Sequence, residues 1–153
     1  MGIGKIGELC VKGPQVIQRY WMQAADIEYA LTPDGWLLTG DLARIDHQGF
    51  VFIVGRKKEL ILVSGFNVYP EEVEHVIQQN PKVKEVAVIG VLSDKTGEAI
   101  KAFVVRADES LTTEELLNYC RAALTAYKLP HEIIFLKHLP KSMLGKILKK
   151  ELH

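Results

Sequence analysis

The sequence has few of the residues that mark disulfide-bonded or metal-binding proteins. It contains two cysteines, Cys10 and Cys120, far apart and without the clustered spacing of metal ligands. We therefore expect buried free thiols in a reducing compartment, and neither a disulfide nor a nucleophile. The five histidines form no HxxH or HExxH pair, so we expect no metal site.

An excess of one charge and long apolar runs are also missing. Lys plus Arg and Asp plus Glu number 19 each, which gives the chain no global attraction to nucleic acid or to a membrane surface. No apolar run approaches the ~20 residues of a membrane-spanning helix. No apolar secretory core follows Met1, so we expect no secretory signal. With 153 residues, the chain can form one ordinary core, or one compact domain plus part of another.

The first third of the chain has the pattern of a small β-rich region. Residues 7–12 alternate like a strand, and a Gly-Pro pair ends them. Residues 41–46 and 50–55 flank a short glycine-containing loop, which predicts a β-hairpin. A short helix is predicted over residues 24–31, before a turn that contains proline and glycine.

A run of four charged residues, 56–59, indicates an exposed connector, and the pattern changes after it. Strands and helices are then mixed, which predicts an α+β domain with a small sheet and flanking helices. The predicted strands are 60–63, 84–92, 102–105 and 132–136, and the predicted helices are 70–80, one that opens with a capping box at 112–115, and a short terminal one over 146–152. Strands 84–92 and 102–105 are apolar on both faces, so we expect central strands covered by helices.

Lys146 lies in a segment with two opposite interpretations, Pro140-Lys141-Ser142-Met143-Leu144-Gly145-Lys146-Ile147. A lysine directly after glycine in a mobile turn can bring an ammonium to phosphate or carboxylate oxygens. However, four lysines within ten residues are also typical of a solvated basic tail, and local chemistry alone favours that tail. Lys141, Lys149 and Lys150 are expected to be surface charge.

Four segments together resemble the adenylate-forming, AMP-binding superfamily, which includes acyl-CoA synthetases, firefly luciferases and peptide-synthetase adenylation domains. They occur in the family's order and are Trp36–Asp41 (the Trp-x-x-Thr-Gly-Asp element), Gly55–Ile61 (the hinge), Val63–Glu74 (the loop after the hinge) and Pro140–Ile147 (the C-terminal lysine motif). The sequence of this loop, Ser-Gly-Phe-Asn-Val-Tyr-Pro, is most similar to that of bacterial long-chain fatty acyl-CoA synthetases.

This resemblance implies a ligase that works in two half-reactions. A fatty acid carboxylate attacks the α-phosphate of Mg²⁺-bound ATP, and the thiol of coenzyme A then displaces AMP from the acyl-adenylate. It also implies that residues 1–55 are a β-rich remnant of the large N-terminal domain and that residues 56–153 are the small C-terminal domain, which rotates between the two steps. The large domain would be the partner of this chain, which we expect to be inactive by itself.

The resemblance also implies a role for individual residues. Asp41 would accept hydrogen bonds from the ribose hydroxyls, Arg56 would contact the ribose or phosphate, and Asn67 would reach the adenylate. Lys146 would be the catalytic lysine that bridges the substrate carboxylate and the α-phosphate. Lys58 would be the pivot of the hinge. The tunnel for the pantetheine arm of coenzyme A would be lined by Ser64, Gly65 and Phe66.

Two alternatives stay open at this point. The chain can be a standalone binding or regulatory module of the same fold, or part of a ligase for another carboxylic acid or for a carrier protein. The ligase interpretation predicts an exposed apolar surface in residues 1–55, whereas the standalone module predicts a covered one. The resemblance further implies a cytoplasmic location with peripheral contact at the inner face of the membrane.

Overall fold

The computed structural model describes residues 2–16 and 31–152, which form two compact units, Met1–Lys58 and Glu59–His153. The division predicted after residue 55 concerns the domains of a larger enzyme and stays a prediction. Of the helix predicted over 24–31, only Leu31 lies among the described residues, where it forms a bridge with Leu37.

The first unit is a three-stranded antiparallel sheet with the order β1-β2-β3. The strands are β1 (Ile6–Val11), β2 (Leu37–Ile45) and β3 (Val51–Arg56), so the predicted strand and hairpin are confirmed. In the hairpin turn, one carboxylate oxygen of Asp46 accepts the backbone N–H groups of Gln48 and Phe50. Among the described hydrophobic residues of this unit, only Leu42 and Ala43 are buried, so this sheet has little core of its own.

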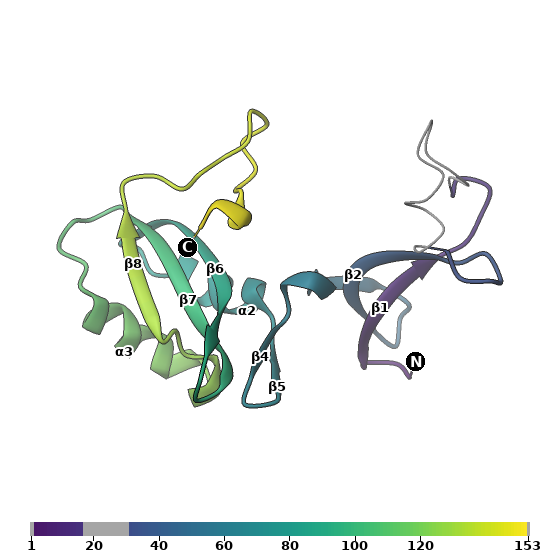
Figure 1. Cartoon of the computed structure of the whole chain (residues 1–153), viewed down its shortest axis with the longest axis horizontal. Helices are drawn as coiled ribbons and strands as arrows, with labels where there is room; N and C mark the ends of the chain where they lie inside the picture. The colour runs from purple at the N-terminus through teal and green to yellow at the C-terminus, as the bar shows by residue number, and fades with distance from the viewer. Residues whose placement is uncertain (1, 17–30, 153) are drawn as a thin grey trace. The chain divides into compact units, whose positions relative to one another are not determined.

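The second unit contains a five-stranded sheet with the order β5-β4-β7-β6, in which β8 also pairs with β7 (Figure 1). The strands are β4 (Ile61–Val63), β5 (Phe66–Val68), β6 (Val83–Ser93), β7 (Gly97–Arg106) and β8 (Glu132–Leu136). All pairs are antiparallel except β7 with β8. Because α-helices accompany this sheet, the predicted α+β fold is confirmed.

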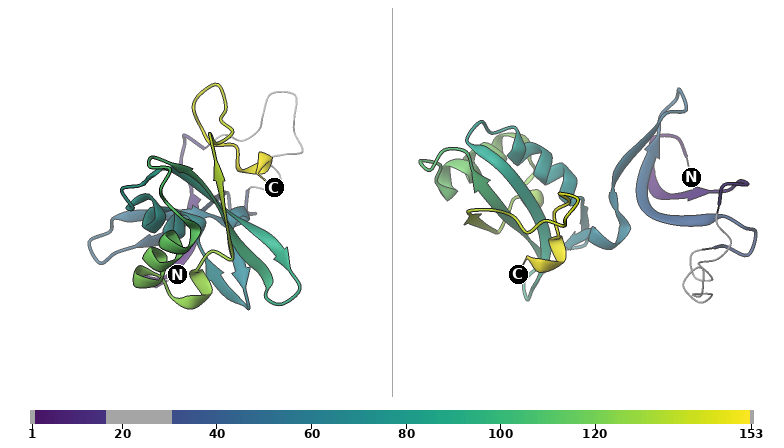
Figure 2. Two further views of the ribbon diagram at one scale, coloured as in Figure 1. Left: turned by 90° about the vertical axis from the view of Figure 1, so that its left-hand side faces the viewer. Right: turned by 90° about the horizontal axis from the view of Figure 1, so that it is seen from above.

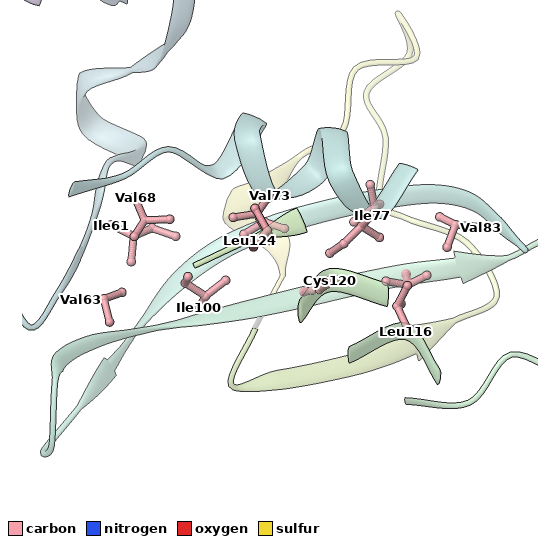
Figure 3. Close-up of a cluster of buried hydrophobic side chains, with 14 of the residues drawn as sticks. Ile61, Val63, Val68, Val73, Ile77, Val83, Ile100, Leu116, Cys120 and Leu124 are labelled. Carbon is pink, nitrogen blue, oxygen red and sulfur yellow. The ribbon is translucent and has the colours of Figure 1, made fainter. Parts of the chain in front are cut away.

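Two helices pack on one face of the sheet and complete its main core. Helix α2 (Pro70–Gln78) begins with proline at its first position, where the missing N–H does no harm. Helix α3 (Thr113–Ala123) is capped by Thr112, whose hydroxyl accepts the N–H of Glu115. Figure 3 shows the buried side chains between the helices and strands; they include Ile61, Val68, Val73, Ile77, Ile100, Leu116 and Cys120.

The opposite face of the sheet is covered differently from the prediction. A second core cluster joins Phe103 and Val105 of β7 to Leu139 and Leu152 of the C-terminal segment. Figure 2 (left) shows the helices on one side of the sheet and this segment, in yellow, on the other. The prediction that helices cover both faces was therefore wrong, because an irregular segment buries the second face. The predicted central position is confirmed for β7 only, since β6 is the last strand in the pairing order.

Three short 3₁₀ turns complete the described structure, and they are η1 (Lys57–Glu59), η2 (Ala126–Lys128) and η3 (Lys149–Glu151). The terminal helix predicted over 146–152 is reduced to η3. The lysine segment before it forms a turn with its own hydrogen bonds, so its backbone groups are not available to an α-helix. No helix of the described residues is long and apolar enough to cross a membrane.

Candidate functional site

Asp41 and Arg56 form an ion pair across neighbouring strands of the first unit. They are direct partners in the β2–β3 register, and Arg56 Nε lies 2.7 Å from Asp41 Oδ1. The hydroxyl of Thr39 accepts the N–H of Asp41 and donates to the carbonyl of Leu9, which fixes the backbone before the carboxylate. The side chain of Asp41 is 25% exposed and that of Arg56 is 48% exposed, so both can still contact a ligand. The sheet thus brings together two residues predicted to bind the nucleotide.

Lys58, the predicted pivot, lies in the middle of the η1 turn between the two units and is exposed. On one side of it, Lys57 Nζ lies 2.7 Å from Glu8 Oε2, which ties the start of the turn to β1. On the other side, Glu59 binds Lys149 in the second unit. The turn is thus held at both ends while its central side chain projects into solvent.

The predicted coenzyme A loop is a tight hairpin turn between β4 and β5. Its two central residues, Ser64 and Gly65, both have positive φ, at 51° and 82°, as a two-residue hairpin turn of the primed type requires. The N–H of Ser64 donates to the carbonyl of Thr96 at 2.8 Å. The N–H of Leu62 donates to the carboxylate of Glu98 at 2.6 Å, so β7 holds the hairpin in place.

Phe66 and Asn67 follow this turn on β5, and both are exposed. The ring of Phe66 stacks on Tyr127 with the centroids 4.8 Å apart. Next to the pair, Ser64 and Tyr127 line a cleft of about 500 Å³ whose other walls include Lys95, Arg121 and His131. These three basic residues were missed by the sequence analysis, because they come from separate segments and share no motif.

Lys146 lies on a projecting hairpin, the yellow loop after β8 in Figure 1. Lys141 bridges Ile147, the N–H of Ser142 donates to the carbonyl of Lys146 at 2.8 Å, and the N–H of Gly145 closes the turn onto Ser142. The N–H of Lys146 also donates to the hydroxyl of Ser142 at 3.2 Å. Lys146 is exposed, so an ammonium is presented to solvent by a turn with a defined conformation. The sequence predicted that Lys146 opens a short helix, and the structure shows that it does not.

Lys149 differs from its predicted role as surface charge. Its side chain is 23% exposed, and its ammonium pairs with both Glu59 and Glu74. No local pattern could reveal this, because the two carboxylates are far away in the sequence. Lys141 is also paired, with Glu85 at 2.9 Å, but its side chain is 40% exposed.

The two thiols are free, as predicted, and Cys120 is buried whereas Cys10 is half-buried. Burial raises the pKa of the Cys120 thiol to about 11, so it is protonated at neutral pH. Among the described residues, no three His, Cys, Asp or Glu side chains are grouped in a way that could hold a metal ion.

Comparison with known proteins gives one consistent result. Residues 72–146 match the AMP-binding enzyme C-terminal domain. The chain is 56% identical over 149 residues to a long-chain-fatty-acid–CoA ligase of Escherichia coli O6:H1, which covers 97% of this chain and 26% of that protein. The chain thus spans about a quarter of the length of the curated relatives it matches.

Solved structures agree with the match in sequence. ATP-bound MatB from Rhodopseudomonas palustris superimposes with a TM-score of 0.91 at 40% identity, covering 99% of this chain and 30% of that one. The o-succinylbenzoate–CoA synthetase MenE of Bacillus subtilis, in complex with its acyl-adenylate, superimposes with a TM-score of 0.91 at 35% identity. The match covers 99% of this chain and 31% of the MenE chain.

Proposed function

Because this chain belongs to the AMP-binding, adenylate-forming enzyme family, we propose that it is the C-terminal part of an ATP-dependent long-chain fatty acid–CoA ligase. The family membership confirms the resemblance predicted from the four motifs. The observation that carries the functional proposal is that 56% identity to a long-chain-fatty-acid–CoA ligase extends over 97% of the chain. ATP with Mg²⁺, a fatty acid and coenzyme A would be the substrates of the complete enzyme.

The choice of acid is the finer part of the proposal. Long-chain-fatty-acid–CoA ligases are up to 56% identical to this chain, whereas MenE, whose acid is o-succinylbenzoate, is 35% identical. This difference supports a long-chain fatty acid over an aromatic acid. Both kinds of relative are named as CoA ligases or CoA synthetases, which supports free coenzyme A over a carrier protein as the acceptor.

In the first half-reaction, we propose that Asp41 and Arg56 bind the nucleotide. Lys146 would contact the reacting carboxylate and α-phosphate. A carboxylate offers only acceptors, so Asp41 suits two vicinal ribose hydroxyls. Arg56, which is paired with Asp41, would reach a ribose or phosphate oxygen. Asn67 would reach the adenylate. The exposed ammonium of Lys146 would neutralise the negative charge that grows between the carboxylate and the α-phosphate.

In the second half-reaction, we assign coenzyme A to the turn formed by Ser64, Gly65 and Phe66. Gly65 has no side chain, and a Cβ placed there would meet no atom within 4 Å, so a thin pantetheine chain could pass close to the backbone. Rotation about the turn that contains Lys58 would move the hairpin of Lys146 out of the active site and bring this loop into it.

An exposed apolar surface on the first unit supports a large domain as the partner. Its exposed hydrophobic side chains include Ile45, Phe50, Val51, Phe52 and Ile53, with exposed fractions between 41% and 62%. These residues are close together along the β2–β3 hairpin, and exposed apolar residues gathered in one region are typical of an interface. This is the surface expected of a ligase part, and it disfavours the standalone module. We also propose a cytoplasmic location, with peripheral contact at the inner membrane face.

The proposal can be tested in a grafted ligase, in which this chain replaces the matching portion of the Escherichia coli relative. The graft should convert a long-chain fatty acid, ATP and coenzyme A to acyl-CoA, while the 153-residue chain alone should not. In the graft, Lys146→Ala should slow the exchange of labelled pyrophosphate into ATP by ~100–1,000-fold. It should leave thioester formation from preformed acyl-adenylate unchanged.

Two results would contradict the proposal. An inactive graft of the unaltered chain would show that the chain cannot serve as the C-terminal part of this ligase. Pyrophosphate exchange at the unaltered rate in Lys146→Ala would remove the assignment of the catalytic lysine.

A further inference from the structure

Lys149 stands out among the residues with no assigned role, because two carboxylates bind it at once. Its Nζ lies 2.8 Å from Glu74 Oε1 and 3.1 Å from Glu59 Oε2. The three side chains are between 20% and 30% exposed, so the cluster is partly shielded from solvent. Such shielding strengthens the attraction and makes the loss of one partner more costly.

The three residues come from three separate elements of the second unit. Glu59 is the last residue of the η1 turn, and Glu74 lies on α2. The same oxygen of Glu74 that binds Lys149 accepts the N–H of Val88 on β6 at 2.8 Å, which ties the helix to the sheet. Lys149 therefore joins the C-terminal turn η3 both to the rigid sheet-and-helix body and to the end of the connector.

The charges of the cluster make Lys149 necessary for its geometry. Burial opposes the charge of this ammonium, but its hydrogen bonds and attraction to Glu74 and Glu59 outweigh that effect and raise its pKa. Burial raises the pKa of a third carboxyl, Glu71, which also feels Lys149 and the other two glutamates. Without Lys149, Glu59 and Glu74 would face each other as like charges and would separate.

The position of Lys146 depends on this junction. Lys146 is only three residues before Lys149, and it lies on a hairpin whose stem is closed by the N–H of Leu148 donating to the carbonyl of Pro140. The tip of that hairpin is exposed, with Met143 and Leu144 almost fully in solvent. Anchoring therefore has to come from the base of the hairpin, where Ile147 and Leu152 pack on the sheet, Lys141 binds Glu85 of β6, and Lys149 binds its two glutamates.

We propose that Lys149 is a positioning residue for the adenylation step, which holds the hairpin of Lys146 in a set position relative to the connector and α2. The inference rests on the proposed function. When the unit rotates about the connector, a fixed link from Glu59 to Lys149 delivers Lys146 to one defined place. Displacement of a catalytic group by about 1 Å can lower the rate by about 100-fold.

The test uses the grafted ligase with Lys149→Met, which keeps most of the side-chain length and removes the charge. Pyrophosphate exchange should fall by about tenfold or more, while thioester formation from preformed acyl-adenylate and coenzyme A should stay unchanged, because Lys146 acts only in the first step. Lys149→Arg should restore much of the exchange. The matched control is Lys150→Met, which removes the same charge from the next, exposed residue and should change neither step.

Glu59→Gln provides a second, milder variant that removes only the link to the connector. It should lower pyrophosphate exchange selectively, and the double variant with Lys149→Met should be no worse than Lys149→Met alone. Equal losses in both half-reactions would assign Lys149 a general structural role and overturn the proposal. Unchanged exchange in Lys149→Met, or an equal loss in Lys150→Met, would overturn it as well. Failure of the proposed function itself is distinguishable, since it would appear as an inactive graft of the unaltered chain or as a Lys146→Ala variant without effect.

Discussion

Gly65→Ala is a sharp test of the proposed coenzyme A loop, because the structure separates its effect on the fold from its effect on the ligand. Gly65 has φ of 82° at the tip of the β4–β5 turn. An added Cβ would meet no atom within 4 Å, so alanine creates backbone strain but no clash within this chain. Any steric effect of the methyl group must therefore come from a bound ligand.

The expected magnitudes follow from that geometry. A non-glycine residue in the left-handed region costs about 1–2 kcal/mol. A loss of 1 kcal/mol lowers the midpoint of thermal unfolding by about 4–8 °C in a domain of up to 100 residues. An extra methyl group in a well-packed site typically costs ~1–3 kcal/mol. If pantetheine passes this turn, thioester formation should slow by roughly 5- to 150-fold.

Thermal unfolding of the chain and the two half-reactions of the grafted ligase measure these effects separately. Gly65→Ala should keep pyrophosphate exchange near its unaltered rate and slow the reaction of preformed acyl-adenylate with coenzyme A. The control is Gly49→Ala, which has the same kind of strain, at φ of 87°, and equally open space around an added Cβ. It should leave both half-reactions unchanged.

The reasoning would be refuted if Gly65→Ala left the thioester step at its unaltered rate. The turn would then be a structural hairpin, and pantetheine would pass elsewhere. A parallel loss in both half-reactions would also refute it, since it would point to a damaged domain and not to a crowded ligand path.

Three further predictions concern the second unit by itself. Leu116→Ala removes a fully buried core side chain and should lower the free energy of unfolding in urea by about 2–5 kcal/mol, whereas Leu144→Ala, at 96% exposure, should change it little. Burial raises the pKa of Glu71 above its ordinary 4.5, so ionisation of this carboxyl destabilises the folded state as pH rises above 4.5. Glu71→Gln should therefore raise the free energy of unfolding at pH 7. The gain should vanish below about pH 4, where the glutamate is protonated. A stabilising effect that persisted in acid would contradict this cause. The Cys120 thiol, buried and with its pKa raised to about 11, should react with a thiol reagent at pH 8 only after denaturant is added, and labelling of the folded chain at Cys120, detected by mass spectrometry, would contradict its burial.

Much of the fold could be predicted from local signals. Alternating residues predicted β1, and a short glycine-containing loop predicted the β2–β3 hairpin. Proline at position 70 and the capping threonine at position 112 predicted the starts of both helices. These signals are local because backbone geometry and capping depend on residues only a few positions apart. Motif order was equally informative, since it identified the family before any contact was known.

The tertiary structure alone decided what surrounds the functional side chains. A glycine before Lys146 indicated a turn, but only the bridge between Lys141 and Ile147 shows that this turn is a hairpin and not the start of a helix. The charge of Lys149 was plain in the sequence, and its location between Glu59 and Glu74 was not. Such partners lie far apart along the chain, and only the pairing of strands and helices brings them within a hydrogen bond of each other. The sequence therefore predicted which residues would carry the chemistry, and the fold determined which of them are held in place.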